Sequence, residues 1–248
     1  MLAITGLAKS FDGFWAIRNL DFALHERERH AVIGPNGAGK TTFFNLISGQ
    51  LAPTMGEIRF RDTPLAGLAP HAIVKLGIAR SFQRVNIFPR LSVFENLQAA
   101  LIAHHGHAFD LVRRGATLHR AEVEAALGAV GLADDRTKLA GLLAHGKQKQ
   151  LELALALATD PDLLLLDEPT AGMSPQETTE IIRSIGRLAG ERGLTLLFTE
   201  HDMDVVFTIA DRISVLHHGE LITSGPPEEV RADKEVQRVY LGGGNGPA

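Results

Sequence analysis

The segment spanning residues 30–42, HAVIGPNGAGKTT, constrains the fold of this 248-residue chain more than any other stretch. It places Gly34, Gly39, Lys40 and Thr41 in the pattern G-x-x-x-x-G-K-[ST], directly after an apolar run and before the helical segment TTFFNLISG. A phosphate-binding loop requires this strand–loop–helix context. A chance match to the pattern alone is expected in roughly one chain per hundred of this size. The context makes chance a poorer explanation.

The residue types of this loop suit the binding of a nucleoside triphosphate. Glycines allow backbone N–H groups to curl around the β-phosphate, and Lys40 adds positive charge near the β- and γ-oxygens. The Thr41 hydroxyl is placed to hold Mg²⁺. We therefore expect a nucleoside triphosphate and Mg²⁺ as cofactors. The residues predicted to bind the nucleotide here are Gly34, Pro35, Asn36, Gly37, Ala38, Gly39, Lys40, Thr41 and Thr42.

A second apolar run, LLLLDEPTAG, ends in two acids. Four leucines in a row suit a strand that is buried on both faces, with its carboxyl end at a ligand crevice. Asp167 is placed to hold Mg²⁺ through water, and Glu168 to orient or deprotonate an attacking water. The alternative is a solvated acidic strand end, which the accompanying phosphate loop makes a minor possibility.

Two further polar residues follow strand-like runs. LTLLFTEHD delivers His201 to the same crevice edge, where we expect it to contact the γ-phosphate. A lone histidine is more often structural, but its place after a third core strand favours the functional interpretation. Gln83 closes GIARSFQ, where strand signals give way to helical ones. A polar residue that leaves a strand is usually just polar, so Gln83 is a weaker candidate on its own.

The order of periodicities along the chain predicts an α/β fold with a mostly parallel core sheet. The front third is β-rich, the middle has helical spacing without convincing strands, and strand–helix alternation then returns. RISVLHHGELITSG is predicted to form a hairpin with HHG as its turn. The predicted units are residues 1–83 (first part of a catalytic core), 84–158 (an inserted α-helical subdomain), 159–240 (second part of the core) and 241–248 (a flexible tail).

Composition excludes several classes of function. The chain has no cysteine, so disulfides and thiolate metal sites are excluded. Its formal net charge of −4 provides no general attraction to nucleic acid, and no nucleic-acid partner is expected. No uncharged apolar run approaches the ~20 residues that a membrane-spanning helix needs.

These motifs, taken in order, resemble the ATP-binding subunits of ABC transporters. The resemblance covers almost the whole chain and implies a P-loop NTPase core with N-terminal antiparallel β elements and an inserted α-helical subdomain. In such subunits an aromatic for adenine, the phosphate loop, a glutamine loop, a signature helix, an acid-tipped strand, a D-loop and a switch histidine follow one another. The corresponding segments here are KSFDG, GPNGAGKTT, SFQ, LAHGK, LLLLDEP, AGMSP and TEHD.

The stretches RSFQRVNIFPRLSVFENLQAA and LAHGKQKQLELALAL resemble, more narrowly, the longer ATPase of bacterial branched-chain amino acid importers. This resemblance implies a second homologous ATPase subunit or a second copy, two membrane permease subunits and, indirectly, a periplasmic binding protein. It implies a peripheral position at the cytoplasmic face of the inner membrane. Urea-type importers and lipopolysaccharide exporters stay open as alternatives, as does a soluble ATP-dependent clamp or switch on nucleic acid.

The resemblance also implies roles for individual residues. Phe11 would stack on adenine, with Phe14 and Trp15 as rivals and simple packing as the alternative. Gln83 would complete the shell of Mg²⁺ and water. Glu168 would be the general base and His201 the sensor of the γ-phosphate.

The signature stretch implies a contact with another subunit. Two such subunits pack head to tail, so that the helix beginning near Gly146 would direct its N–H groups and dipole at the partner's γ-phosphate. Here Ala144 lacks the usual serine hydroxyl, His145 replaces a glycine and Lys147 replaces a glutamine. We hypothesise that His145 and Lys147 take over part of the phosphate contact; the alternative is that only backbone amides matter. Ser174 stands where the D-loop usually has aspartate.

Two other features have competing interpretations. The run HHGH at residues 104–107 could bind a metal, but a solvent-exposed loop is favoured because no spaced carboxylate accompanies it. Ile87, Phe88 and Leu91 are candidates for docking a membrane subunit, and core packing explains them equally well. Besides a transport motor and a nucleic-acid clamp, a nucleotide-gated regulator without turnover is a third possible class of function, and Glu168 and His201 argue against it.

Overall fold

The computed structural model describes residues 1–81, 86–106 and 118–241. Gln83 and the tail 242–248 lie outside the described residues. Within these ranges, no helix combines the length and apolarity needed to cross a bilayer. The elements are β1 (Leu2–Phe11), β2 (Phe14–Leu24), β3 (Arg29–Ile33), α1 (Lys40–Ile47), β4 (Met55–Phe60), β5 (Thr63–Pro64), α2 (Pro70–Lys75), β6 (Ile78–Ser81), α3 (Val93–His104), α4 (Arg120–Ala129), η3 (Ala133–Asp135), η4 (Ala140–Leu142), α5 (His145–Leu157), β7 (Leu163–Asp167), α6 (Pro175–Arg192), β8 (Thr195–Thr199), α7 (Met203–Ile209), β9 (Arg212–His217), β10 (Glu220–Gly225), α8 (Pro227–Ala232) and α9 (Lys234–Leu241).

A six-stranded sheet in the order β10-β9-β3-β8-β7-β6 forms the core. The pairs β9–β3, β3–β8, β8–β7 and β7–β6 are all parallel, and only β10 runs antiparallel to its neighbour. The predicted hairpin is confirmed: His217 pairs with Glu220 across a turn at His218 and Gly219, both with positive φ. The mostly parallel core sheet expected from the alternation of strands and helices is therefore confirmed.

The leucine run of β7 supplies both faces of this sheet. Leu164 and Leu166 belong to one hydrophobic cluster, whereas Leu163 and Leu165 belong to the other. Successive side chains of a strand point to opposite faces, so a strand covered on both sides needs apolar residues at every position. This explains why the sequence shows an unbroken run here and not an alternation.

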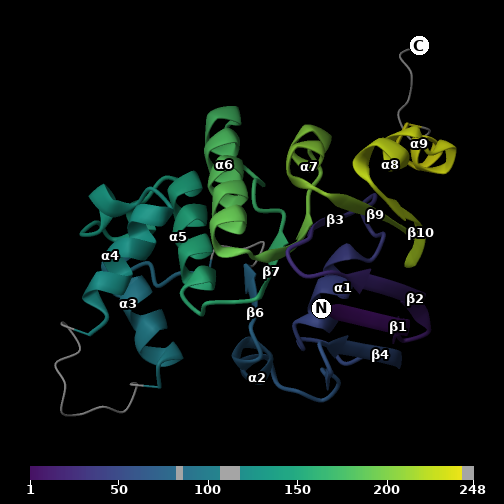
Figure 1. Ribbon diagram of the computed structural model, residues 1–248, viewed down its shortest axis with the longest axis horizontal. Coiled ribbons are helices and arrows are strands. Elements are labelled where there is room, and N and C mark those ends of the chain that lie inside the picture. The colour runs from purple at the N-terminus through teal and green to yellow at the C-terminus, as the bar shows by residue number, and fades with distance from the viewer. Residues whose placement is uncertain (82–85, 107–117, 242–248) are drawn as a thin grey trace.

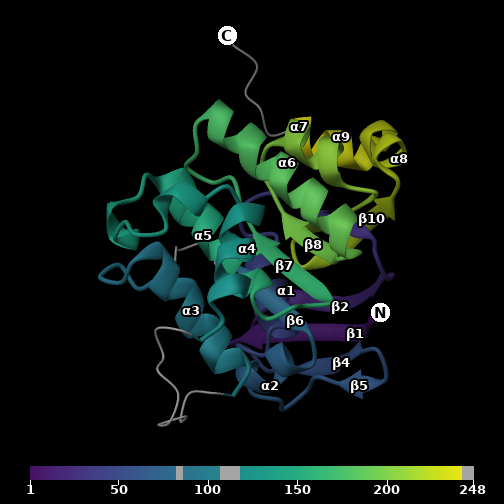
Figure 2. The ribbon, with the colours of Figure 1, turned by 60° about the vertical axis from the view of Figure 1, so that its left-hand side comes forward.

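A second sheet in the order β2-β1-β4-β5 is antiparallel throughout. Helix α1 is enclosed between the two sheets, because its Phe43 and Phe44 share a buried cluster with Leu7 of β1 and Leu165 of β7. Figures 1 and 2 show β1, β2 and β4 on one side of the core strands, and α6 and α7 on the other. The N-terminal antiparallel elements are thus confirmed.

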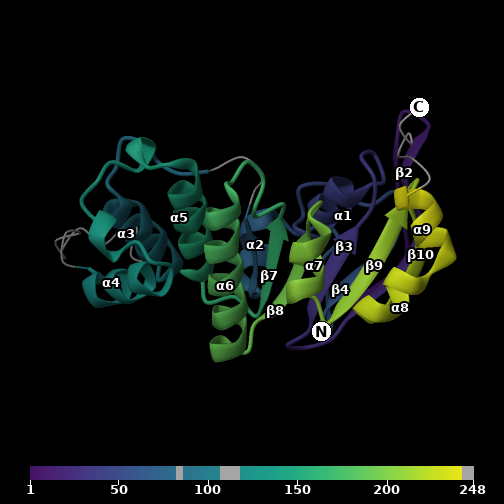
Figure 3. The ribbon, with the colours of Figure 1, turned by 90° about the horizontal axis from the view of Figure 1, so that it is seen from above.

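Helices α3, α4 and α5 lie between β6 and β7 in the chain. In Figures 1 and 3, α3 and α4 lie at one end of the molecule, away from β2, β9 and β10. Their buried residues, such as Leu97 and Leu151, belong to the same cluster as Ile185 of α6 and Phe198 of β8. The helical segment therefore shares one continuous apolar core with the sheet face that α6 covers.

The burial of β7 predicts a large effect of core truncation. Leu165→Ala should lower the free energy of unfolding by about 2–5 kcal/mol, because a fully buried side chain is lost and a cavity remains. Leu142→Ala is the matched control, since that leucine is 81% exposed and its truncation should change the free energy by no more than about 0.5 kcal/mol. Denaturant titration of both variants measures the difference. Equal effects would contradict the assigned burial.

Candidate nucleotide-binding site

The predicted phosphate loop connects β3 to α1. Gly37 and Gly39 have φ values of 79° and 108°, which side-chain-bearing residues rarely adopt. A Cβ atom at Gly34 would lie 2.2 Å from the Leu216 carbonyl oxygen, so this position has no room for a side chain. Lys40 Nζ donates to the carbonyl oxygens of Gly34 (2.6 Å) and Pro35 (3.2 Å). The lysine thus lies against its own loop.

The environment of Lys40 favours a bound anion. Burial lowers the pKa of the Lys40 ammonium group, and the nearby carboxylates of Glu168 and Asp167 oppose that shift only in part. A partly desolvated ammonium group gains from any further negative charge. The phosphate chain of a nucleotide would supply such charge at this position.

An open pocket of about 490 Å³ extends from this loop. Its lining joins the loop to the β1–β2 hairpin, where Phe11 and Phe14 pair directly, and to Glu168 at the end of β7. Phe11 is 40% exposed and Phe14 66%, so both rings offer a face for stacking. Trp15 does not line this pocket. The structure keeps Phe14 beside Phe11 as a candidate for contact with a base.

The carboxylate of Asp167 is buried at the end of β7. Thr199 Oγ1 donates to its Oδ1 (2.9 Å), and the guanidinium group of Arg80 donates to its Oδ2 (2.9 Å). Arg80 also contacts Asn45 and Ser48 of the α1 region, at 2.7 and 2.9 Å. Arg80 therefore joins the acidic strand end to the helix that follows the phosphate loop. The sequence analysis did not identify Arg80; its only signal was a lone cation in the buried strand IARS.

Glu168 leaves the strand in a left-handed conformation, with φ of 51°. Its N–H donates to both the hydroxyl and the carbonyl oxygen of Thr199, each at 3.2 Å. His201 Nε2 lies 2.8 Å from Glu168 Oε1. Two of the three residues predicted to be catalytic, Glu168 and His201, are therefore in direct contact, although 33 positions separate them in the chain.

Glu200 holds the two strand ends together. Its Oε1 accepts from the N–H and the hydroxyl of Thr170, at 2.9 and 2.7 Å, and its Oε2 accepts from the His201 N–H at 3.2 Å. Burial raises the pKa of this carboxyl group, because desolvation outweighs the hydrogen bonds that stabilise the anion. Glu200 was also missed by sequence reasoning, which treated TEHD only as the carrier of His201.

The predicted signature stretch forms the beginning of α5, with Ala144 as its N-cap. His145 Nε2 donates to the Ala171 carbonyl oxygen at 3.3 Å. A Cβ atom on Gly146 would lie 2.4 Å from Glu177 Oε1, so the carboxylate of Glu177 lies close to the Gly146 backbone. The N-terminus of α5 already has a carboxylate of its own chain beside it.

Lys147 points to a different partner. Its Nζ lies 2.5 Å from Asp135 Oδ2, and Lys138 Nζ lies 2.6 Å from Asp135 Oδ1. The Asp135 side chain is only 3% exposed, whereas both lysines are largely solvated. Hydrogen bonds from Lys138 and Lys147 lower the pKa of the Asp135 carboxyl group. The ammonium group of Lys147 is therefore engaged within the chain.

The predicted residues fall into two separate groups. The phosphate loop, Phe11 and Glu168 surround one pocket, with Asp167 and His201 adjacent to Glu168. Residues 144–147 do not line that pocket. Ser174 caps α6, accepting from the Glu177 N–H at 3.4 Å. Gln83 lies outside the described part of the chain.

The chain is similar to known protein families and to individual known proteins. A family model described as "ABC transporter" matches residues 17–171, and one described as "Branched-chain amino acid ATP-binding cassette transporter" matches residues 220–245. The chain is 40% identical to the high-affinity branched-chain amino acid transport ATP-binding protein LivG of Salmonella typhimurium, covering 98% of each.

Two solved structures are similar over nearly their full length. One is the ADP conformation of an ATP-binding cassette of an ABC transporter, with 27% identity, a TM-score of 0.85 and 98% of both chains covered. The other is a dimeric post-hydrolysis ATP-binding cassette bound to ADP and Pi, with 25% identity and a TM-score of 0.79. It covers 92% of this chain and 99% of that one.

The Asp135 cluster predicts a pH-dependent contribution to stability. Its pKa in the folded chain is lowered, so the contribution is present above the ordinary aspartate value of about 3.9 and is lost as the pH falls through the folded-state value. At pH 7, Asp135→Asn should lower the free energy of unfolding by about 1–2 kcal/mol, since two charged hydrogen bonds weaken while both lysines stay solvated. Urea titrations at several pH values measure this.

The control for this experiment is Asp134→Asn, because the neighbouring Asp134 side chain is exposed. The difference between Asp135→Asn and the unmodified protein should begin to shrink below about pH 4, where the aspartate of the unfolded chain becomes protonated while that of the folded chain is still ionised. A difference that stays constant down to pH 2 would contradict the assigned role.

Proposed function

The chain belongs to the ABC transporter family, and from that premise we propose that it is the ATP-hydrolysing subunit of a bacterial importer of branched-chain or related amino acids. Two findings support the choice of solute. The family model that matches residues 220–245 is described by branched-chain amino acids, and the LivG relative is 40% identical over almost the whole chain. Urea-type importers and lipopolysaccharide exporters are the alternatives within the family.

The phosphate loop would bind the nucleotide. Its backbone amides and Lys40 would hold the β- and γ-phosphates, and the ring of Phe11 or Phe14 would stack on adenine. Binding would draw the Lys40 ammonium group away from the carbonyl oxygens of Gly34 and Pro35, which it contacts in the isolated chain. The change exchanges neutral acceptors for charged ones, which strengthens the hydrogen bonds.

The residues present also fit Mg²⁺. A hydroxyl at Thr41 and a carboxylate at Asp167 are the hard oxygen donors that this ion prefers. Asp167 is fixed by Thr199 and Arg80, so its orientation is set before a ligand arrives. Bound Mg²⁺ would neutralise charge on the phosphates during transfer. Gln83 stays a prediction as a further contact.

Glu168 would act as the general base. Its left-handed backbone carries the carboxylate out of the strand, beside Lys40 and the phosphate loop. There it would accept a proton from the attacking water or orient it toward the γ-phosphate. His201 holds the carboxylate through Nε2 and would contact the γ-phosphate from the same crevice edge. The contact between these two side chains is the observation that carries the hydrolytic function.

We propose that two ATPase subunits pack head to tail, with each nucleotide between the phosphate loop of one and the α5 N-terminus of the other. The separation of these two groups within the chain supports this, since residues 144–147 do not line the pocket. The carboxylate of Glu177 lies beside Gly146, so this helix end suits an anion. The partner is a homologous subunit or a second copy.

The side chains of Lys147 and His145 in the signature stretch would have different roles. Lys147 is held by Asp135, so we now expect it to support α5 from the side. His145 remains near the loop that follows Glu168, through its contact with Ala171. We propose that backbone amides make the main contact with the partner's γ-phosphate and that His145 adds to it. Release of the partner's γ-phosphate would then be felt, through His145 and Ala171, by the segment between Glu168 and Ser174.

The helical segment would transmit motion to the membrane. We propose that residues 84–158 form a subdomain that docks on two membrane permease subunits at the cytoplasmic face of the inner membrane, with a periplasmic binding protein delivering the solute. Phe88 is 61% exposed and Leu91 36%, and nearby Leu142 is 81% exposed. Exposed apolar side chains of this size suit a protein interface. Ile87 packs partly against the core instead.

Glu168→Gln tests hydrolysis and pairing together. The variant should bind Mg-ATP normally but hydrolyse it about 10²–10⁴ times more slowly, because the proton acceptor is lost. With its natural partner subunits present, it should accumulate as a pair in Mg-ATP. Steady-state phosphate release and light scattering measure the two effects. Glu228→Gln, at an exposed glutamate of α8, is the control.

Each outcome bears on a separate part of the proposal. Unchanged turnover in Glu168→Gln would refute the role of Glu168 as the base. A variant that hydrolyses slowly yet stays strictly single in Mg-ATP would refute the head-to-tail arrangement.

His145→Gly tests the signature contact. Histidine changes charge near pH 6.5, so a contact with phosphate should make the ATPase activity of the unmodified protein depend on pH in a way that the variant lacks. The control is His71→Gly, which also removes an exposed histidine from the first turn of a helix, α2. Identical pH profiles for the unmodified protein and His145→Gly would contradict a role for His145, and only the backbone amides would then contact the partner's γ-phosphate.

A further inference from the structure

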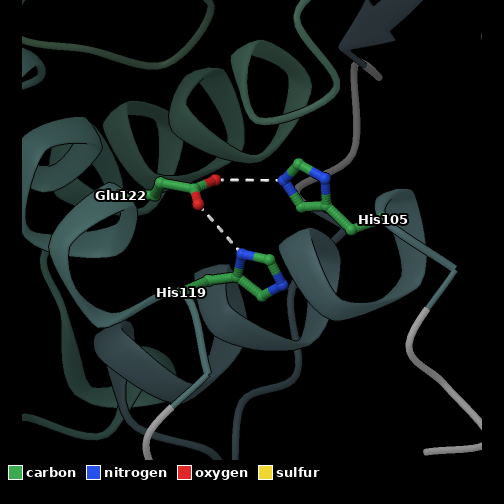
Figure 4. A group of neighbouring side chains, drawn as sticks. All are labelled: His105, His119 and Glu122. Atoms are coloured by element: carbon green, nitrogen blue, oxygen red, sulfur yellow. Dashed lines mark hydrogen bonds and ion pairs between the residues drawn. The ribbon is translucent and has the colours of Figure 1, made fainter.

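Three metal-ligating side chains converge at the adjacent ends of α3 and α4, far in sequence from the phosphate loop. His105 is the C-cap of α3, His119 is the N-cap of α4, and Glu122 lies in the first turn of α4. Their ligand atoms all lie within 4.8 Å of one another. Figure 4 shows both imidazole rings directed at the same carboxylate.

The two histidines hydrogen-bond to different oxygens of the same carboxylate. His105 Nε2 lies 3.0 Å from Glu122 Oε2, and His119 Nδ1 lies 3.0 Å from Glu122 Oε1. Bonds of about 2.0–2.1 Å in a tetrahedral arrangement place neighbouring ligand atoms roughly 3.3 Å apart. The ligand atoms of the cluster, all within 4.8 Å of one another, are therefore near that spacing but not yet at it. For one ion to bind both rings, the rings would have to turn out of their parallel stack so that each nitrogen points at the ion.

The backbone at His119 is arranged for this contact. Its φ is 55° and its ψ 22°, a left-handed conformation that costs energy for a residue with a side chain. The ring stacks on that of His105 with centroids 4.3 Å apart and an interplanar angle of 6°. The His119 side chain is only 10% exposed, whereas that of Glu122 is 52% exposed. The cluster thus has a partly buried base and an open side.

We propose that His105, His119 and Glu122 form a zinc site, with water in the fourth position of the ion. Imidazole and carboxylate are zinc ligands, and three of them with an open position match known zinc chemistry. On binding, the ring protons that face Glu122 would move to His105 Nδ1 and His119 Nε2, leaving neutral nitrogens as ligands. The ion would connect the end of α3 to the start of α4. Mg²⁺ prefers an all-oxygen shell and would not replace it.

This site differs from the metal interpretation of the HHGH run. His104 is adjacent to His105, and their rings lie 5.2 Å apart, yet His104 does not belong to the cluster. The carboxylate that the run itself lacks comes from Glu122, which α4 brings alongside. His104 therefore provides a matched control: an exposed histidine one position away.

The test is zinc binding by nucleotide-free protein that carries no histidine tag. Equilibrium dialysis with elemental analysis should find one zinc ion per chain. His105→Gln, His119→Asn and Glu122→Gln should each weaken binding about 100-fold, at or above the loss that removing an outer-shell partner causes. Asparagine is chosen at position 119 because it tolerates the left-handed backbone. His104→Gln should bind zinc like the unmodified protein.

Spectroscopy provides a second, independent measurement. Co²⁺ in place of zinc should give visible absorption bands of a four-coordinate ion, which the three variants lose and excess Mg²⁺ leaves unchanged. Circular dichroism shows whether each variant is folded. Zinc binding that persists in all three folded variants, or is lost equally in His104→Gln, would overturn the proposal. So would the absence of stoichiometric zinc in the unmodified protein.

Discussion

The rest of the site depends on a carboxylate fixed at the end of a strand that is buried on both faces. Asp167 follows four buried leucines, and its two oxygens are occupied by Thr199 and Arg80. A buried charge is tolerated only when paired and hydrogen-bonded, so these contacts keep the strand end in one place. The backbone of Glu168 follows directly after this fixed residue. Its contact with His201 follows from the register of β7 on β8.

Under the proposed head-to-tail arrangement, each chain would supply half of a reaction centre. One end of the core sheet supplies the phosphate loop, the acids and the histidine, whereas the helix that suits a phosphate begins elsewhere, at His145. Each half contacts groups of its own chain. Lys40 contacts loop carbonyl oxygens, and the α5 N-terminus contacts Glu177. Nucleotide and partner would replace these internal contacts.

The sequence was sufficient where chemistry follows local pattern. The phosphate loop, the buried leucine strand and the hairpin at His217–Glu220 could all be predicted, because their signals lie within a few residues of one another. The contacts of Arg80 with Asp167 and of Lys147 with Asp135 could not, because each joins segments whose proximity depends on the packed fold. The His105–Glu122 contact was missed for the same reason: no spacing rule places the ends of two helices together. Phe11 and Phe14 both line the pocket, so each remains a candidate for the ring that stacks on adenine.

The continuous apolar core described for the helical segment limits how this molecule can deform. Leu151 of α5 and Ile185 of α6 belong to one cluster with Leu166, one residue before Asp167. A hinge turns on a few loop residues, whereas here buried side chains of α5, α6 and β7 pack in one apolar cluster. Displacement of the helical segment would therefore proceed by shear, in small sliding steps of side chains across one another. Such a joint is stiff and transmits force with little slack.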